Sequence, residues 1–335
     1  MNQTSGMKVL VTGANGLLGS HVVRVLIQQG FPVRVLVREG SNLQALDGLQ
    51  IELFKGNISS AENVERAVKG CDFIVHAAAR TSQSPSGIVA YIEPNILSTQ
   101  LIINAASKFG IKRLVYVSTA NCFGNGSKKH PGDEEKPFLT WMKKSGYAFS
   151  KWQAQQMVLK SADTDNMDVV VVNPTFLIGE NDVKPSSGKI FFHIVNKRVV
   201  FYPPGGKNFV DAEVAAQGVV NALLIGKKGE CYLLTGENLS YREFFKKVAK
   251  VTGQTSVFFP LPRWLIIMMG YFGSFIEKVF RIPVDLTLVN AKMLCLENYY
   301  SSEKAIREID FQQIPVEESI EKAILWFRNN NYFEK

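Results

Sequence analysis

Thr12-Gly13-Ala14-Asn15-Gly16-Leu17-Leu18-Gly19 lies between a short apolar run at Lys8–Val11 and an amphipathic stretch at Leu17–Gln29. Glycines spaced as GxxGxxG between a strand and a helix are typical of a dinucleotide-binding turn. They close the turn, let the backbone approach a pyrophosphate, and let the helix pack on the strand. The free N–H groups at the N-terminus of the helix would face the phosphates. We therefore expect a cofactor site here, with contacts from Gly13, Asn15, Gly16, Leu17, Leu18 and Gly19.

Strand-like and helix-like segments alternate from this turn to residue 172. The pattern predicts strands at 8–11, 33–37, 51–54, 73–76, 113–118 and 168–172, and helices at 17–29, 61–69, 97–109 and 147–161. Such alternation indicates βαβ units and a parallel sheet that is covered on both faces. We predict an α/β protein with a Rossmann-type doubly wound parallel sheet.

The rhythm changes after Asn173-Pro174, where turn-rich segments precede a helix and a strand that return to the sheet. The sequence from residue 237 onward has a mostly helical pattern. We therefore assign residues 1–174 and 207–236 to a dinucleotide-binding Rossmann domain. Residues 175–206 and 237–335 are expected to form a smaller, mostly helical substrate-binding lobe.

The composition is that of a globular protein, since 46% of the 335 residues are hydrophobic and 20% are charged. No apolar run reaches the ~20 residues needed to span a bilayer, and the polar start at residues 1–6 predicts no signal peptide. The cysteines form no CxxC pair, which is typical of a reducing compartment. They are Cys71, Cys122, Cys231 and Cys295. We expect a cytoplasmic protein.

The charged residues and histidines also restrict the partners. The net charge is +8, but the basic residues are dispersed, so we predict no nucleic-acid partner. The histidines form neither HxH nor HxxxH, so we predict no metal site. They are His21, His76, His130 and His193. A small-molecule substrate is the expected partner, and a homodimer remains open.

An arginine, Arg38, follows the second predicted strand. NAD enzymes typically place an acidic residue there to hold the ribose hydroxyls, whereas a guanidinium suits a 2′-phosphate. The sequence therefore favours NADP over NAD, with a plain surface arginine as the alternative. The ends of two other strands also fit a dinucleotide site. They contribute Asn57, Ile58, Ala77, Ala78 and Ala79.

Tyr147-Ala148-Phe149-Ser150-Lys151 forms a YxxxK motif at the start of a predicted helix. Residues four apart share one helix face, so the ammonium group can approach the phenol. A neighbouring cation favours the phenolate, so we expect Lys151 to lower the pKa of Tyr147 from its ordinary value near ~10. About thirty residues earlier, Val117-Ser118-Thr119-Ala120 ends a strand and offers a hydroxyl to the same carbonyl.

These motifs, in this order over roughly residues 7–240, resemble the extended short-chain dehydrogenase/reductase superfamily, which includes the NAD-dependent epimerase/dehydratase family. The resemblance implies that Tyr147 is the general acid or base, that Lys151 tunes it and bonds the nicotinamide ribose, and that Thr119 orients the substrate oxygen. It also implies further cofactor contacts, from Asn95, Val117, Asn173 and Pro174, besides Tyr147 and Lys151.

Two departures from the family pattern narrow the chemistry. Ala120-Asn121 stand where the sugar-nucleotide 4,6-dehydratases have Asp-Glu, so elimination of water is disfavoured. Nucleotide-sugar enzymes carry an arginine that grips diphosphate near the segment Gly206–Asp211, where this chain offers Lys207. The pattern is more similar to dihydroflavonol reductase and 3β-hydroxysteroid dehydrogenase-like members.

We therefore expect an oxidoreductase that uses NADP, or less favourably NAD, to reduce a carbonyl or oxidise a secondary alcohol on a fairly apolar small molecule. A nucleotide-sugar epimerase with the same Tyr, Lys and Thr is one alternative. A non-catalytic dinucleotide-binding protein is the other. The sequence does not identify the substrate.

Trp264–Ile276 is an apolar stretch of thirteen residues (WLIIMMGYFGSFI). It is too short to span a bilayer, and its predicted helix is apolar nearly all round. We expect protein to cover it, as a wall of the substrate pocket or at a subunit contact, with Gly270 and Gly273 allowing close approach. A lipid-interface helix is the alternative, but we expect no membrane partner.

Overall fold

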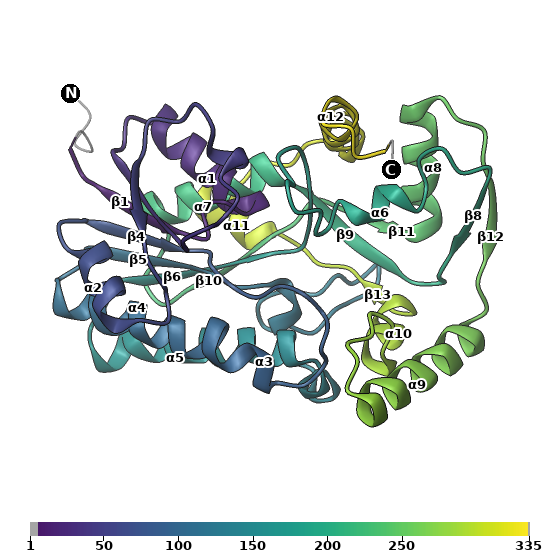
Figure 1. Ribbon diagram of the computed structural model, residues 1–335, viewed down its shortest axis with the longest axis horizontal. Helices are drawn as coiled ribbons and strands as arrows, with labels where there is room; N and C mark the ends of the chain where they lie inside the picture. The colour runs from purple at the N-terminus through teal and green to yellow at the C-terminus, as the bar shows by residue number, and fades with distance from the viewer. Residues whose placement is uncertain (1–5, 334–335) are drawn as a thin grey trace.

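A computed structural model describes residues 6–333, so the ends of the assigned ranges, 1–5 and 334–335, lie outside the described residues. The larger domain is built on a parallel seven-stranded sheet with the order β10-β6-β5-β4-β1-β2-β3 (Figure 1). Its strands are β1 (Val9–Thr12), β2 (Val33–Val37), β3 (Glu52–Lys55), β4 (Phe73–His76), β5 (Arg113–Val117), β6 (Val169–Pro174) and β10 (Cys231–Leu234). The predicted α/β class and parallel sheet are confirmed.

Helices cover both faces of this sheet (Figure 1). On one face, α1 (Leu17–Gln28), α7 (Ala212–Ile225) and α11 (Glu303–Ile309) bury an apolar core against the strands. On the other face, α2 (Ala61–Val68), α4 (Ser98–Lys108) and α5 (Gly146–Thr164) bury a second core. Shorter helical turns lie between them, namely η1 (Gln44–Leu46), α3 (Val89–Tyr91), η2 (Ile92–Leu97), η3 (Ala120–Cys122) and η4 (Thr140–Lys144).

The strand order reverses at β1, which pairs with β2 on one side and with β4 on the other. Chain connections therefore leave in opposite directions at this point and open a crevice beyond the carboxyl ends of the strands. Ligands of open α/β sheets bind in such crevices. The glycine turn lies here because it follows β1 directly.

The smaller lobe combines short strands with helices and has its own apolar core. One sheet has the order β11-β9-β13, with β7 also paired to β9, and a second sheet pairs β12 with β8. The strands are β7 (Phe176–Ile178), β8 (Val199–Tyr202), β9 (Gly206–Asp211), β11 (Glu237–Ser240), β12 (Val257–Pro260) and β13 (Glu297–Asn298). The helices are α6 (Lys189–Phe192), α8 (Tyr241–Thr252), α9 (Arg263–Phe280), α10 (Leu288–Leu294) and α12 (Val316–Asn329).

Two segments lie on the opposite side of the expected domain division. Strand β9 falls in the range 207–236 assigned to the Rossmann domain, yet it pairs with β7, β11 and β13 of the smaller lobe. Helix α11 falls in the range 237–335 assigned to the lobe, yet Ala305 and Ile309 are buried in the core beneath the large sheet. Long-range pairing and burial decided both placements, and neither has a local sequence signal.

Within one chain, protein covers only part of Trp264–Ile276: Ile266 and Met269 line a cleft, as expected of a pocket wall, and a subunit contact of the outer side stays a prediction. This stretch forms most of α9, and on the described chain Trp264 and Phe272 are each 66% exposed. Only Ile266, Gly270 and Gly273 of this helix are buried. Within residues 6–333, no helix is long and apolar enough to cross a membrane.

The two glycines of α9 allow close contact with α10 and with the segment that leads into it. A Cβ on Gly270 would lie 2.5 Å from Cβ of Ala291, and a Cβ on Gly273 would collide with the carbonyl oxygen of Leu286. The expected close approach is therefore present, and it explains why this narrow face of α9 is the buried one.

We predict that Gly273→Ala destabilises the protein by about 1–3 kcal/mol, because overpacking forces the backbone at Leu286 to move. Urea unfolding of the purified variant measures this change. Gly87→Ala is the matched control, since a Cβ on Gly87 meets nothing within 4 Å. Equal stability of the two variants would contradict the packing described here.

Candidate active site

The glycine turn is held against the neighbouring strand end by backbone contact. Gly13 has φ +71°, and a Cβ there would lie 2.6 Å from the backbone nitrogen of Ala78. Gly16 is the N-cap residue of α1, so no N-cap side chain accepts a hydrogen bond from the first N–H groups of the helix. The first turn of α1 also carries no acidic residue. The N–H groups at this helix end are therefore available to an anion. This geometry fits the pyrophosphate of a dinucleotide.

One continuous cleft runs from this turn to the smaller lobe. Most of the residues expected to bind the cofactor line it, including the exposed Arg38. The lining residues among them are Gly13, Asn15, Gly16, Leu17, Leu18, Gly19, Arg38, Asn57, Ile58, Ala77, Ala78, Ala79, Val117, Tyr147, Lys151 and Pro174. Asn57 also accepts a hydrogen bond from Ser59 N–H at 3.0 Å, which fixes the turn after β3.

Two expected cofactor ligands lie behind the cleft instead of lining it. Asn95 is buried, accepts from the backbone N–H of Arg80 at 2.7 Å, and donates to the hydroxyl of Ser150 at 2.9 Å. Asn173 is fully buried and donates to the backbone carbonyl of Thr119 at 2.9 Å. Both amides therefore help to position the lining segments, and their direct contact with the cofactor stays a prediction.

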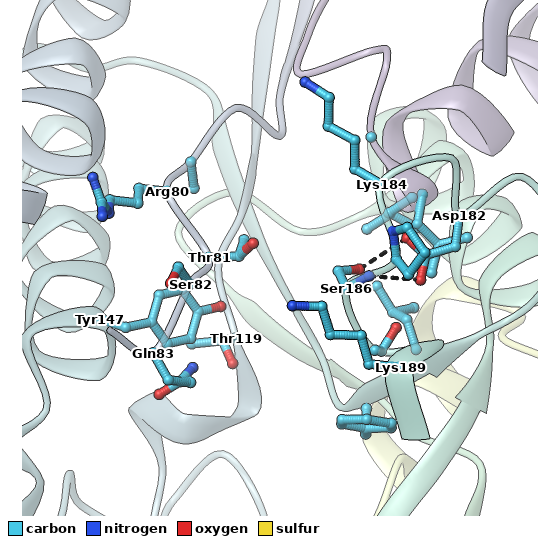
Figure 2. A pocket seen from close by; sticks show the side chains of 18 of the residues that line it. Arg80, Thr81, Ser82, Gln83, Thr119, Tyr147, Asp182, Lys184, Ser186 and Lys189 are labelled. Carbon is cyan, nitrogen blue, oxygen red and sulfur yellow. Dashed lines mark hydrogen bonds between the residues drawn. The ribbon is translucent and has the colours of Figure 1, made fainter. Parts of the chain in front are cut away.

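Tyr147, Lys151 and Thr119 all line this cleft. Helix α5 supplies Tyr147 and Lys151 from its first two turns, and its N-cap, Ser145, accepts from the N–H of Ala148. Thr119 follows the end of β5. Figure 2 shows the Thr119 and Tyr147 side chains close together. The structure thus brings together the three residues expected to carry catalysis.

Burial sets the protonation of this group. It raises the pKa of Tyr147 to about 12, although a hydrogen bond with Thr119 acts in the opposite direction. This corrects the expected direction, because burial desolvates the phenolate and so raises the pKa of Tyr147. Lys151 donates to the carbonyl of Val117 at 2.7 Å and lies 4.2 Å from the ring centroid of Tyr116, and burial lowers its pKa to about 7. Tyr147 is therefore neutral at physiological pH and able to donate a proton.

Two loops that carry no motif also line the cleft. Figure 2 shows Arg80, Thr81, Ser82 and Gln83 near Tyr147, and Lys184, Ser186 and Lys189 across the open space from them. Asp182 holds the second loop by accepting from the backbone N–H groups of Ser186 and Gly188, each at 2.9 Å. The only sequence signal was the turn-rich segment at 185–188, so their place at the site could not be predicted.

Lys207, on β9, also faces the cleft. Its ammonium nitrogen lies 4.9 Å from the ring centroid of Phe176, and burial lowers the pKa of this lysine to about 8. Across residues 6–333, the structure gives it no ion pair. Lys207 is therefore a desolvated cation that is available to an acceptor group in the cleft.

The sheet, the glycine turn and the Tyr–Lys pair define a dinucleotide-dependent oxidoreductase built on the Rossmann fold. Residues 9–212 match the NAD dependent epimerase/dehydratase family, and the chain belongs to it.

The names of the relatives of this chain indicate that they act on different compounds. It is 29% identical to a putative dihydroflavonol 4-reductase of Synechocystis, with 96% of this chain and 95% of the relative covered. It is 25% identical to a decarboxylating sterol-4-alpha-carboxylate 3-dehydrogenase of Candida albicans, covering 96% and 98% of the two chains. A solved nucleoside-diphosphate-sugar epimerase of Pseudomonas aeruginosa matches with a TM-score of 0.81 at 26% identity, over 98% of this chain and 100% of that one.

We predict that Lys207→Met raises the free energy of unfolding by about 1–3 kcal/mol at pH 7, because the folded protein no longer buries a charge. The wild-type lysine has a lowered folded pKa, so its penalty is complete below pH about 8 and disappears as the pH approaches 10.5. The difference between variant and wild type should therefore shrink across that range. Urea unfolding at several pH values measures it.

The exposed Lys246 on α8 provides the control, since Lys246→Met removes a solvated charge. A Lys207→Met variant that is less stable than wild type at pH 7 would show that the ammonium is stabilised by contacts not described above.

Proposed function

We propose that this protein is an NADP-dependent oxidoreductase that reduces a ketone or aldehyde on a fairly apolar small molecule, or runs the reverse reaction. The observation that carries the proposal is the convergence of Tyr147, Thr119 and Lys151 in a cleft that extends from the α1 N-terminus into an apolar lobe. The named relatives that act on dihydroflavonols and sterols support a substrate of this class.

The cofactor would lie along the carboxyl ends of the strands. The N–H groups at the start of α1 would bind its pyrophosphate, and Arg38 would pair with the 2′-phosphate at the end of β2. The small side chains of Ala77, Ala78 and Ala79 leave room for it beside β4. When bound, the cofactor supplies or accepts the hydride.

Side chains of the protein would carry out the proton transfer that accompanies hydride transfer. Tyr147 donates its phenolic proton to the carbonyl oxygen during reduction, and its raised pKa keeps that proton in place beforehand. Thr119 hydrogen-bonds the same oxygen and holds it toward Tyr147. Lys151, anchored on the carbonyl of Val117, would favour the phenolate that forms when its ammonium is charged.

The far end of the cleft accounts for an apolar substrate. Phe176, Phe192, Ile266, Met269 and Met293 line it in the smaller lobe. Pockets of this kind bind ligands through apolar contact and use a few polar groups for orientation. Lys207 is such a group, and it would orient a carboxylate or another acceptor on the substrate.

A nucleotide-sugar epimerase is the second candidate. Lys184, Lys189, Lys197 and Lys207 all line the cleft, and together they could hold a diphosphate. Incubation of the purified protein with NADPH and panels of ketones, aldehydes and UDP-sugars separates the candidates. NADPH oxidation with carbonyl compounds supports the reductase, whereas interconversion of UDP-sugars without net NADPH oxidation supports the epimerase.

For a carbonyl substrate found in that panel, Tyr147→Phe should lower turnover by about 10²–10⁴-fold, because it removes the proton donor and keeps the ring. NADPH affinity, measured by fluorescence titration, should change little. Tyr271→Phe removes a hydroxyl from an exposed tyrosine and is the matched control. Turnover by Tyr147→Phe near that of wild type would refute the assignment.

We also predict that Arg38→Asp lowers the ratio of NADPH affinity to NADH affinity by more than tenfold. The variant loses charge-assisted hydrogen bonds of about 1.5–3 kcal/mol each and adds repulsion. Fluorescence titration with both cofactors measures the ratio. Arg242→Asp, at an exposed position of α8, should leave the ratio unchanged. Tighter binding of NADH than NADPH by the wild type would overturn the preference for NADP.

A further inference from the structure

The outer face of α9 is the largest concentration of exposed aromatic side chains on the described chain. Along α9, apolar residues recur every three or four positions on one face, namely Trp264, Met268, Tyr271, Phe272, Phe275 and Val279. Each of them is more than half exposed, between 54% and 66%. Just before the helix, β12 and its partner β8 expose Phe259 and Phe201, whose ring centroids are 6.0 Å apart. Contiguous exposed apolar surface of this kind marks an interaction site.

The charged residues of α9 and of the residue that follows it are mostly basic. Arg263 begins α9, Lys278 lies in its last turn and Arg281 follows it, and all three are exposed. The one acidic residue of α9, Glu277, accepts from the backbone N–H of Ser86 at 3.0 Å and from its hydroxyl group. Its charge is therefore directed toward the protein, and the outer face presents cations beside apolar and aromatic groups.

We propose that the outer face of α9 docks this protein on the surface of an anionic lipid bilayer. A helix that presents apolar and aromatic residues between basic residues lies in the interfacial region, with its apolar side among the acyl chains and its cations at the headgroups. The helix has 18 residues, so it is about 27 Å long and lies along the surface. This replaces the expectation of a protein-covered helix without a membrane partner.

A second copy of the chain fits this face less well than lipid. Where a twofold axis passes through α9, this helix packs against its own copy, and its basic ends meet basic ends. In an antiparallel pair, Arg263 would lie against Lys278 and Arg281 of the other chain. In a parallel pair, each cation would face its own equivalent. Glu277 is held by Ser86 and does not offset this repulsion.

The position of α9 also connects the docked surface with the cleft. Ile266 and Met269 of this helix line the cleft, as do Leu286 and Met293 of the segment that follows. In Figure 1, α9 and α10 lie together at the lower edge of the smaller lobe, away from α8 and α12. Docking through α9 would therefore leave the rest of the lobe in water and bring the wall of the cleft to the membrane.

The test is cosedimentation with sucrose-loaded vesicles at physiological salt. The wild type should sediment with vesicles of 70% phosphatidylcholine and 30% phosphatidylserine, and much less with pure phosphatidylcholine. Trp264→Ser with Phe272→Ser should weaken binding by at least tenfold, because two large apolar groups leave the interface. Lys278→Glu with Arg281→Glu should weaken it by a similar factor on anionic vesicles only.

Two controls keep the result specific. Leu325→Ser removes an exposed apolar residue on α12, and Lys246→Glu with Lys250→Glu reverses two exposed charges on α8, so both should bind as wild type does. A blue shift of tryptophan fluorescence on adding anionic vesicles, lost in the Trp264 variant, reports insertion independently of activity. Circular dichroism of each variant verifies folding.

Three results would overturn the proposal. They are absence of binding to anionic vesicles, equal binding to neutral and anionic vesicles, and a concentration-dependent dimer in sedimentation analysis that Trp264→Ser with Phe272→Ser abolishes. None of these readouts uses turnover, so the proposed oxidoreductase can fail while the docking surface stands, and the reverse also holds.

Discussion

The contact between the backbone of Gly13 and the backbone at Ala77 and Ala78 sets the geometry of the whole site. It is possible because Gly13 has no side chain and adopts a positive φ. The contact brings the turn after β1 against the end of β4 and aims the N-terminus of α1 into the crevice where the strand order reverses. The same reversal directs the chain after β5 to the other side of the crevice, where Thr119 and the start of α5 lie. The geometry of the site thus depends on the close approach of two backbone segments of this chain.

The protein part of the catalytic group is organised by buried amides and by desolvation. Asn173 fixes the carbonyl of Thr119, and Asn95 joins the backbone of Arg80 to Ser150 of α5. Such bonds hold reacting groups at a defined geometry, which is what effective proton transfer requires. Burial then keeps Tyr147 protonated and lowers the pKa of Lys151 to about 7, so its ammonium gives up a proton more readily than that of a solvated lysine. The bound cofactor would add its own charges to this balance.

The fold and the central motifs were predictable because they depend on local patterns. A glycine turn between a strand and a helix can be recognised without knowing which distant residues it contacts. The same is true of a tyrosine four residues from a lysine on one helix. The burial of Asn95 and Asn173 behind the cleft could not be predicted, because only tertiary structure shows whether an amide faces a cleft or the interior. Strand β9 and helix α11 were misplaced because their partners are distant in sequence. The apolar pattern of α9 did not indicate which side of the helix is buried, because that side is set by the close packing of Gly270 and Gly273.

The inner and outer sides of α9 have different surroundings, and this difference has a practical consequence for protein engineering. Its inner side, with Ile266 and Met269, belongs to the wall of the cleft, whereas Trp264, Phe272 and Phe275 point away from it. Designers can therefore resurface the outer side with glutamate or lysine to improve yield and crystallisation without redrawing the pocket. Libraries aimed at a new substrate can vary the inner side while retaining the native exterior. Changes on one side of α9 should leave the other side in place, because the packing of Gly270 and Gly273 fixes how the helix is oriented.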